Sequence, residues 1–280
     1  MDAASPMIGF LGFGEAGFHL ARGLRSAGAQ SLVAFDINAQ QRNGTGERIR
    51  ARAAETVTCL VETPRELARR AAVILSVVTA ASAREAAESI AGDLSADHLY
   101  ADLNSVSPAT KGEVASAIGK GAGRFVEGSI MAPVAGADHR VPMLLNGPSA
   151  PALVDALSRY EMRLEVMDGA IGAAAAVKMC RSIVIKGLEA LMVECALAAG
   201  EHGAADRVYD SLRESYPGID WRKTARYMIG RVLEHGERRA HEMDEVASML
   251  RAAGIEPLMA EATARRQRTP KSLLQSVVDV

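Results

Sequence analysis

Short apolar runs and helical repeats alternate along the first half of the chain. The apolar runs have the length of buried strands and fall at residues 8–11, 31–35, 56–61, 72–78, 99–103, 124–130, 143–146 and 163–167. Apolar residues at helical spacing lie between these runs and predict helices at 15–27, 64–70, 82–91 and 108–118. Strands that alternate with helices are joined by right-handed crossovers into a doubly wound sheet. Residues 1–168 are therefore expected to form an α/β domain around a mostly parallel sheet.

The pattern changes at Gly169, after which the chain is rich in Ala, Leu, Arg and Glu. Helices are predicted near residues 170–200, 204–214, 220–234, 236–253 and 257–268, so residues 169–280 are expected to form an all-α domain. The first of these helices is long and apolar on nearly every side, and such a helix must be buried. We expect a second copy of the chain to complete this burial, which predicts a homodimer through the helical domain.

A glycine-rich turn follows the first predicted strand. It consists of Gly12, Phe13, Gly14, Glu15, Ala16 and Gly17, and Asp36 ends the next predicted strand. The glycines allow a tight turn, close approach of a pyrophosphate and close helix packing, and the acid accepts hydrogen bonds from ribose hydroxyls. The unit is typical of a Rossmann dinucleotide-binding domain. The alternative is a strand, turn and helix that bind no nucleotide.

Asp36 also bears on the choice of cofactor. A carboxylate at this position repels a 2′-phosphate, so NAD is favoured over NADP. Arg42 and the run Arg48, Arg50 and Arg52 lie downstream, and NADP stays open because one of these could hold a phosphate. The alternative for these arginines is a solvated helix face.

Composition narrows the classes of partner and compartment. A net charge of −2 and a pI near 6.3 give no basic field for nucleic acid. No run is long enough to span a membrane, no signal peptide is recognisable, and no Cys, His and Asp cluster has metal-ligand spacing. The 3 cysteines argue against a disulfide framework, so a cytoplasmic protein is expected.

Lys178 interrupts the apolar start of the long helix. A buried ammonium must be paired, reach solvent, or have its pKa lowered by desolvation. Arg181 and Ser182 follow at helical spacing on the same face, and together the three side chains are a candidate ligand site at the domain junction. The alternative is a lysine whose head reaches water while its stem covers apolar surface.

The glycine-rich turn and the later Gly169-Ala-Ile-Gly172 segment with Lys178, in this order, resemble the β-hydroxyacid dehydrogenase family, which includes 3-hydroxyisobutyrate and 6-phosphogluconate dehydrogenases. The segments 178–189 and 235–243 are similar to a poorly characterised 6-phosphogluconate-dehydrogenase-like branch. The resemblance implies that Lys178 is the general acid/base. A desolvated lysine can take a proton from a hydroxyl while the nicotinamide accepts hydride, or return it in reduction.

Several positions depart from the family pattern. Ser182 stands where the family has asparagine, and Met131, Ala132 and Pro133 stand where it has Ser-Gly-Gly. The family's later Lys-Asp pair falls at His241-Glu242, and Arg238, Arg239 and His241 are candidates to replace the missing contacts to an anionic substrate. The alternative for Arg238 and Arg239 is a solvated or interface pair. The resemblance also implies that the loop carrying Ser105 and Ser107 lies against the nicotinamide and the substrate.

The sequence thus predicts an NAD(P)-dependent oxidoreductase that acts on a small 3-hydroxy acid or related hydroxy compound. An imine or enamine reductase is an alternative, because Ser182 replaces asparagine, although Lys178 argues against it. A dinucleotide-sensing protein without turnover is the alternative outside the enzymes.

Overall fold

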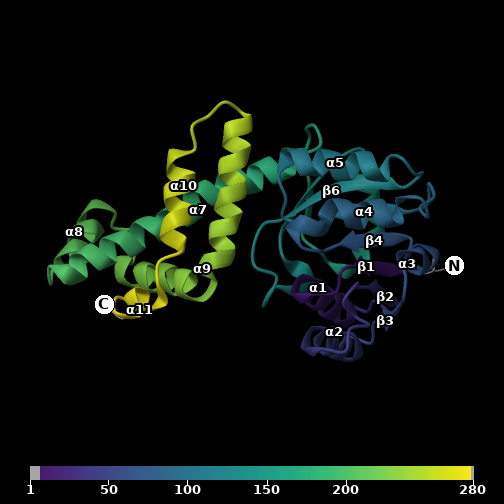
Figure 1. Ribbon diagram of the computed structural model, residues 1–280, viewed down its shortest axis with the longest axis horizontal. Helices are drawn as coiled ribbons and strands as arrows, with labels where there is room; N and C mark the ends of the chain where they lie inside the picture. Colours follow the sequence, from purple (N-terminus) through teal and green to yellow (C-terminus); the bar gives the residue numbers. More distant parts are fainter. Residues whose placement is uncertain (1–6, 279–280) are drawn as a thin grey trace. The chain divides into compact units, whose positions relative to one another are not determined.

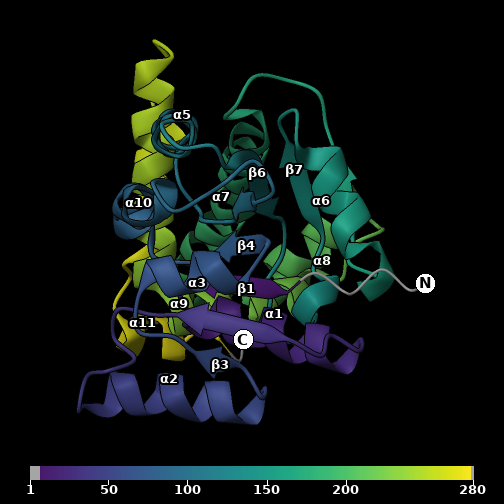
Figure 2. The ribbon, with the colours of Figure 1, turned by 90° about the vertical axis from the view of Figure 1, so that its right-hand side faces the viewer.

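Eight β-strands form one sheet within residues 7–278, which are the residues that this computed structural model describes. They are β1 (Ile8–Leu11), β2 (Leu32–Phe35), β3 (Cys59–Leu60), β4 (Val73–Ser76), β5 (Leu99–Asp102), β6 (Arg124–Ile130), β7 (Met143–Asn146) and β8 (Leu164–Val166). Their order is β3-β2-β1-β4-β5-β6-β7-β8, and every neighbouring pair is parallel except β6 and β7. In Figure 2, the labelled strands β3, β1, β4 and β6 follow one another in this order. The predicted doubly wound, mostly parallel sheet is confirmed.

Helices cover both faces of the sheet. On one face α1 (Glu15–Ser26), α2 (Gly44–Glu55) and α6 (Ala150–Leu157) bury side chains such as Leu20, Ile49 and Leu153. On the other, α3 (Pro64–Arg70), α4 (Ala83–Ala91) and α5 (Pro108–Ile118) bury Leu67 and Ile90, among others. Parallel strands buried on both faces are continuous apolar runs, which is why the strands could be located from such runs in the sequence. The pattern missed α6, and it missed the bounds of α2, which buries little more than Ile49 and Ala53.

The chain divides into two compact units between Lys178 and Met179. We call them unit 1 and unit 2. The long helix α7 (Ala173–Glu201) begins in unit 1 and continues into unit 2. Unit 2 also contains α8 (Ala205–Ser215), α9 (Trp221–Ala252), α10 (Leu258–Gln267) and α11 (Lys271–Gln275), which confirms the predicted all-helical C-terminal region. None of the helices in residues 7–278 is long and apolar enough to cross a membrane.

Two apolar clusters form the core of unit 2. The first joins the later part of α7 with α8, α11 and the start of α9, and it includes Val193, Tyr209 and Ile229. The second joins Met179 with Met243 of α9 and residues of α10. Figure 1 shows α9 and α10 side by side.

The predicted break between two helices near Gly236 is wrong, because α9 runs through it without interruption. A Cβ atom at this position would lie 2.3 Å from the backbone oxygen of Gln267 at the end of α10. Glycine therefore serves here to let α10 approach α9, and the stability gained by packing outweighs its low helix propensity.

Two glycines of α9 provide a matched test of this close approach. Gly236→Ala is expected to lower the free energy of unfolding by about 1–3 kcal/mol through overpacking. Gly230→Ala, whose Cβ would meet nothing within 4 Å, is expected to raise it by about 0.5–1 kcal/mol. Denaturant unfolding of both variants checks this, and equal stability of the two would contradict the tight contact.

Candidate functional site

The glycine-rich turn connects β1 to α1 at the carboxyl edge of the sheet. Gly12 has a φ of +91°, and its N–H donates to the Phe35 carbonyl at 2.8 Å. A Cβ at Gly12 would lie 2.8 Å from the carbonyl oxygen of Val77, which follows β4. Both the backbone angle and the space therefore require glycine at this position.

Gly14 is different, because the fold itself does not require it. A Cβ at Gly14 would meet nothing within 4 Å, and its φ of −73° is open to any residue. It is the N-cap of α1, and no side chain caps this helix. The first-turn amides lack a side-chain acceptor and lie beneath open space, which fits an anionic phosphate group. Glu15 and Ala16 follow in the first turn, and the buried Gly17 packs against Gly12.

Asp36 directly follows β2 and is hydrogen-bonded to this turn. Its carboxylate accepts hydrogen bonds from the N–H of Phe13 at 2.8 Å and of Asn38 at 2.9 Å. A carboxylate has about four acceptor positions, so it can also accept from two ribose hydroxyls. The residues present therefore fit the adenosine half of a dinucleotide. The neighbouring Ile37 exposes 77% of its surface at the same edge.

The arginines downstream of Asp36 differ in their contacts. Arg50 donates to the carbonyls of Ala39 and Gln41, and Arg52 lies 5.7 Å from the centre of the Phe18 ring. Arg48 donates to Thr45 on the exposed face of α2. Arg42 is exposed on the loop between β2 and α2.

Lys178 lies against the loop that follows β5. Its Nζ donates to Ser105 Oγ at 2.5 Å, so these two predicted site residues are brought together within unit 1. Asn104 fixes the same loop, since its amide donates to Ser76 Oγ at 3.0 Å and accepts from the N–H of Val78 at 2.7 Å. Ser107 then caps α5 by accepting from the N–H of Thr110, with Pro108 in the first turn.

Buried charges underlie this loop and were missed by sequence reasoning. Lys111 of α5 is fully buried and donates to the carbonyls of Asp102 at 2.7 Å and Gly128 at 3.0 Å. Its Nζ also lies 3.1 Å from the Asp102 carboxylate. Burial lowers the pKa of Lys111, and the attraction of Asp102 opposes this shift.

Glu127 of β6 is also fully buried. Its carboxylate accepts from the N–H groups of Gly172 at 2.7 Å and Ala175 at 2.8 Å, at the start of α7. The Asn146 amide donates to the same carboxylate at 3.1 Å. The sequence holds one signal that could have identified Lys111 and Glu127, namely a lysine or an acid at a position that the apolar pattern buries.

The segment of Met131, Ala132 and Pro133 follows β6 at the carboxyl edge. Ala132 and Pro133 are exposed, and Met131 is half-buried. Further along the same connection between β6 and β7, Asp138 accepts a hydrogen bond from Arg22 at 2.8 Å and lies 2.9 Å from His19. Burial would raise the pKa of Asp138, but hydrogen bonds from Arg22 and His19 hold it below its usual value.

The remaining predicted site residues belong to unit 2. Ser182 Oγ accepts from Lys186 Nζ at 2.9 Å, and Lys186 lies 2.9 Å from a carboxylate oxygen of Glu242. Burial lowers the pKa of Lys186, and Glu242 opposes this. Arg238 also bonds Glu242, which places this arginine beside Ser182 and Lys186.

The other predicted residues of unit 2 differ in their burial and contacts. His241 is exposed and contacts Glu237 at 3.2 Å, and Arg181 is exposed. Arg239 forms a buried two-point ion pair with Glu189, so it is not a solvated arginine.

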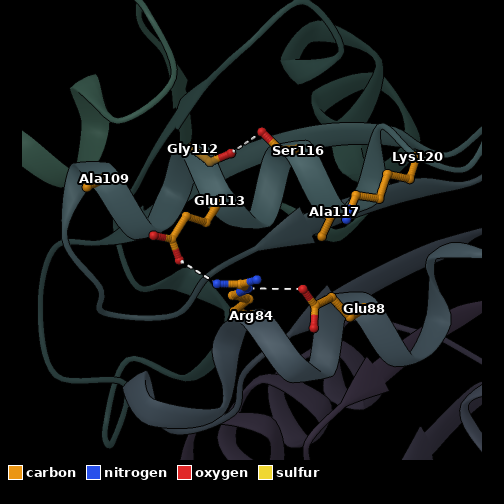
Figure 3. A pocket seen from close by; sticks show the side chains of 8 residues that line it. All are labelled: Arg84, Glu88, Ala109, Gly112, Glu113, Ser116, Ala117 and Lys120. Carbon is orange, nitrogen blue, oxygen red and sulfur yellow. Dashed lines mark hydrogen bonds and ion pairs between the residues drawn. The ribbon is translucent and has the colours of Figure 1, made fainter.

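A pocket between α4 and α5 contains none of the predicted site residues (Figure 3). In this pocket Arg84 forms ion pairs with Glu88 at 3.0 Å and with Glu113 at 3.8 Å, so the charge of the arginine is compensated. Within residues 7–278, no group of three or more His, Cys, Asp or Glu side chains is placed to hold a metal ion.

The fold and the turn after β1 define the class of the protein as a nicotinamide-dinucleotide-binding oxidoreductase. Residues 7–152 match the NAD binding domain of 6-phosphogluconate dehydrogenase, and residues 199–269 match a domain of unknown function, DUF1932. The chain belongs to the 6-phosphogluconate-dehydrogenase-like family, which confirms the resemblance inferred from its motifs.

Solved structures agree with this assignment. A conserved hypothetical protein from Sinorhizobium meliloti 1021 is 35% identical, with 99% of this chain and 97% of the other covered at a TM-score of 0.81. MTH1747, a protein of unknown function described as structurally similar to 3-hydroxyacid dehydrogenases, is 30% identical over 96% and 98%, with a TM-score of 0.77. Mycobacterium tuberculosis 3-hydroxyisobutyrate dehydrogenase with L-serine shares the fold at 17% identity, over 93% and 91%, with a TM-score of 0.74.

Two glycines of the turn separate cofactor binding from folding. Gly14→Ala is expected to leave the stability of the free protein unchanged and to weaken NADH binding by at least about tenfold, or 1.4 kcal/mol. Gly12→Ala is expected to destabilise the free protein by about 1–2 kcal/mol, because alanine disfavours a positive φ. Thermal melts and calorimetric titration measure both, and full NADH affinity in Gly14→Ala would contradict the assignment of the turn.

Proposed function

We propose that the protein is an NAD-dependent oxidoreductase that transfers hydride between the nicotinamide and a small anionic 3-hydroxy acid or related hydroxy compound. The observation that carries this proposal is the contact of Lys178 Nζ with Ser105 Oγ at the carboxyl edge, where the glycine-rich turn also lies. Ligands of doubly wound sheets bind at this edge. The bound nicotinamide supplies the hydride chemistry.

Lys178 acts as the general acid/base in this proposal. In oxidation its neutral Nζ takes the hydroxyl proton of the substrate, and in reduction its ammonium returns a proton to the carbonyl oxygen. The hydrogen bond to Ser105 sets the direction of the lysine side chain. An imine reductase is the alternative enzyme, and turnover of a 3-hydroxy acid in the experiment below decides between the two.

NAD is the proposed cofactor because Asp36 presents its carboxylate where the adenosine ribose binds. A 2′-phosphate there would meet negative charge. Arg50 donates to backbone carbonyls and Arg52 lies over Phe18, so neither is directed at such a phosphate. These contacts support the interpretation of this run as a helix face.

The proposed substrate is anionic and compact. Ala132 and Pro133 carry no side-chain donors, so the segment after β6 offers only backbone groups to an anion. Within unit 2, Lys186 of α7 and Arg238 of α9 both contact the carboxylate of Glu242, and Ser182 accepts from Lys186. In this proposal Arg181, Ser182 and His241 remain candidate substrate contacts.

We also propose a cytoplasmic location. Cys59, Cys180 and Cys195 are free, and Cys59 and Cys180 are exposed. Exposed free thiols persist in reducing compartments, whereas oxidising compartments favour disulfides.

Replacement of Lys178 tests the proposed chemistry. A panel of 3-hydroxy acids is first screened with NAD⁺ and NADP⁺, and NADH and NADPH are titrated in parallel, with NADH expected to bind more tightly. Lys178→Ala is expected to lower kcat by about 10²–10⁴-fold, which is the usual contribution of a general acid/base, and to keep its affinity for NADH. Lys120→Ala, an exposed lysine of unit 1, serves as the control and should keep full activity.

Each failure of this experiment has a defined meaning. Turnover that survives in Lys178→Ala would overturn the role of the lysine. Saturable nucleotide binding without turnover on any substrate would favour a dinucleotide sensor, and absence of binding would overturn the oxidoreductase.

A second copy of the chain is proposed to cover an apolar stripe on α7. Val184, Leu188 and Leu191 share one face of the helix and expose 60%, 39% and 55% of their surface. An exposed apolar stripe of this kind marks an interface. Val184→Asp combined with Leu191→Asp is expected to shift the mass in size-exclusion light scattering from dimer to monomer. Ile255→Asp, an equally exposed apolar residue outside α7, should leave the mass unchanged, and a monomeric wild type would overturn the dimer.

A further inference from the structure

A carboxylate from the sheet accepts hydrogen bonds from the N-terminus of the helix that carries Lys178. Glu127 of β6 accepts from the N–H groups of Gly172 and Ala175, which lie 45 and 48 residues further along the chain. First-turn amides have no partner within their own helix, and the positive end of the helix dipole attracts a carboxylate. Ala175 is less than one turn before Lys178, so this contact fixes the start of the turn from which the lysine projects.

Two further contacts prevent the start of α7 from shifting. The Asn146 amide bridges the Glu127 carboxylate at 3.1 Å and the carbonyl of Ala170 at 2.6 Å. Gly172 has a φ of +103°, and a Cβ there would lie 2.9 Å from the side chain of Pro108. The entry to the helix is therefore held by β6, β7 and the first residue of α5.

The partner of Lys178 is held by the same group of buried charges. Lys111 joins the carbonyl of Asp102, at the end of β5, to the carbonyl of Gly128, the residue after Glu127. The Asp102 carboxylate accepts from the backbone N–H of Asn104 at 3.1 Å, which shapes the loop that presents Ser105. Both ends of the contact between Lys178 and Ser105 thus depend on one network of buried charges.

We infer that Glu127 is a positioning residue that holds Lys178 Nζ at Ser105 without contact to the substrate. The inference rests on the proposed role of Lys178. A carboxylate is required because both of its oxygens must accept, whereas a glutamine would turn an amide donor toward the N–H of Gly172 or Ala175. The carboxylate is buried without solvent, so the loss of one acceptor has no replacement.

Glu127→Gln tests this inference against Thr63→Ala, which removes the side-chain cap of α3 in the same unit. Loss of a cap costs about 1 kcal/mol, so the control measures the effect of a weakened helix start alone. Glu127→Gln is expected to lower kcat by up to about 10²-fold, as a 1 Å displacement of a catalytic group does. KM and the affinity for NADH should stay unchanged, and Thr63→Ala should keep the wild-type kcat.

A second readout does not depend on turnover. The rate at which acetic anhydride modifies Lys178 is followed by mass spectrometry over a range of pH, with Lys120 as the internal reference. The midpoint of this pH dependence, at which Lys178 reacts at half its maximal rate, is expected to change in Glu127→Gln. In Thr63→Ala it should stay at the wild-type value. Wild-type kcat and midpoint in Glu127→Gln would overturn the positioning role while leaving the proposed function intact.

The remaining outcomes also decide between the two proposals. If Lys178→Ala keeps its turnover but the midpoint moves in Glu127→Gln, the proposed role of Lys178 fails and the structural link stands. If Glu127→Gln does not fold, Asn146→Ala replaces it, because this change removes one support and leaves Glu127 in place. A smaller loss of kcat and a shift of the midpoint are then expected, and wild-type values of both would overturn the inference.

Discussion

The position of the candidate site depends on the pairing of a few buried charges near the carboxyl ends of β5 and β6. Lys111, Asp102 and Glu127 are each fully excluded from solvent. A buried charge without a partner is strongly destabilising, so each of these groups has to find its donors or acceptors when the chain folds. The three charged groups and their partners lie on or next to β5, β6, α5 and α7. The placement of these elements in unit 1 therefore follows from charge compensation as well as from apolar packing.

Sheet topology explains why these groups meet. Asp102 and Glu127 are directly paired on parallel strands, and Glu127 is paired with Asn146 on the antiparallel β7. Side chains opposite one another on neighbouring strands point to the same face. These three paired side chains form a row across β5, β6 and β7. Lys111 of α5 contacts the carboxylate of Asp102 at one end of this row. The antiparallel neighbour of β6 thus supplies the amide that joins the sheet to the entry of α7.

The sequence allowed the fold to be predicted where one pattern dominates, as in the apolar run of β1 and the helical repeats of α1 and α4. It failed where tertiary contacts decide, as in α9, where Gly236 belongs to a helix contact and does not end the helix. Of the site, the turn from Gly12 followed from its motif, and Lys178 and the Ser105 loop were each assigned by resemblance, but their contact was not predicted. Glu127 and Lys111 could not be assigned partners, because periodicity shows that a residue is buried but does not show what it meets.

The helical unit shows how one substitution changes the chemistry that a position can offer. An ammonium only donates hydrogen bonds, so Ser182 accepts from Lys186 and keeps a single hydroxyl proton to donate elsewhere. An asparagine at this position would accept through its oxygen and keep two N–H groups. The buried pairs of Lys186 with Glu242 and of Arg239 with Glu189 leave these cations little freedom to turn. These donors are therefore fixed in direction, and a ligand with several acceptor oxygens would be complementary to them.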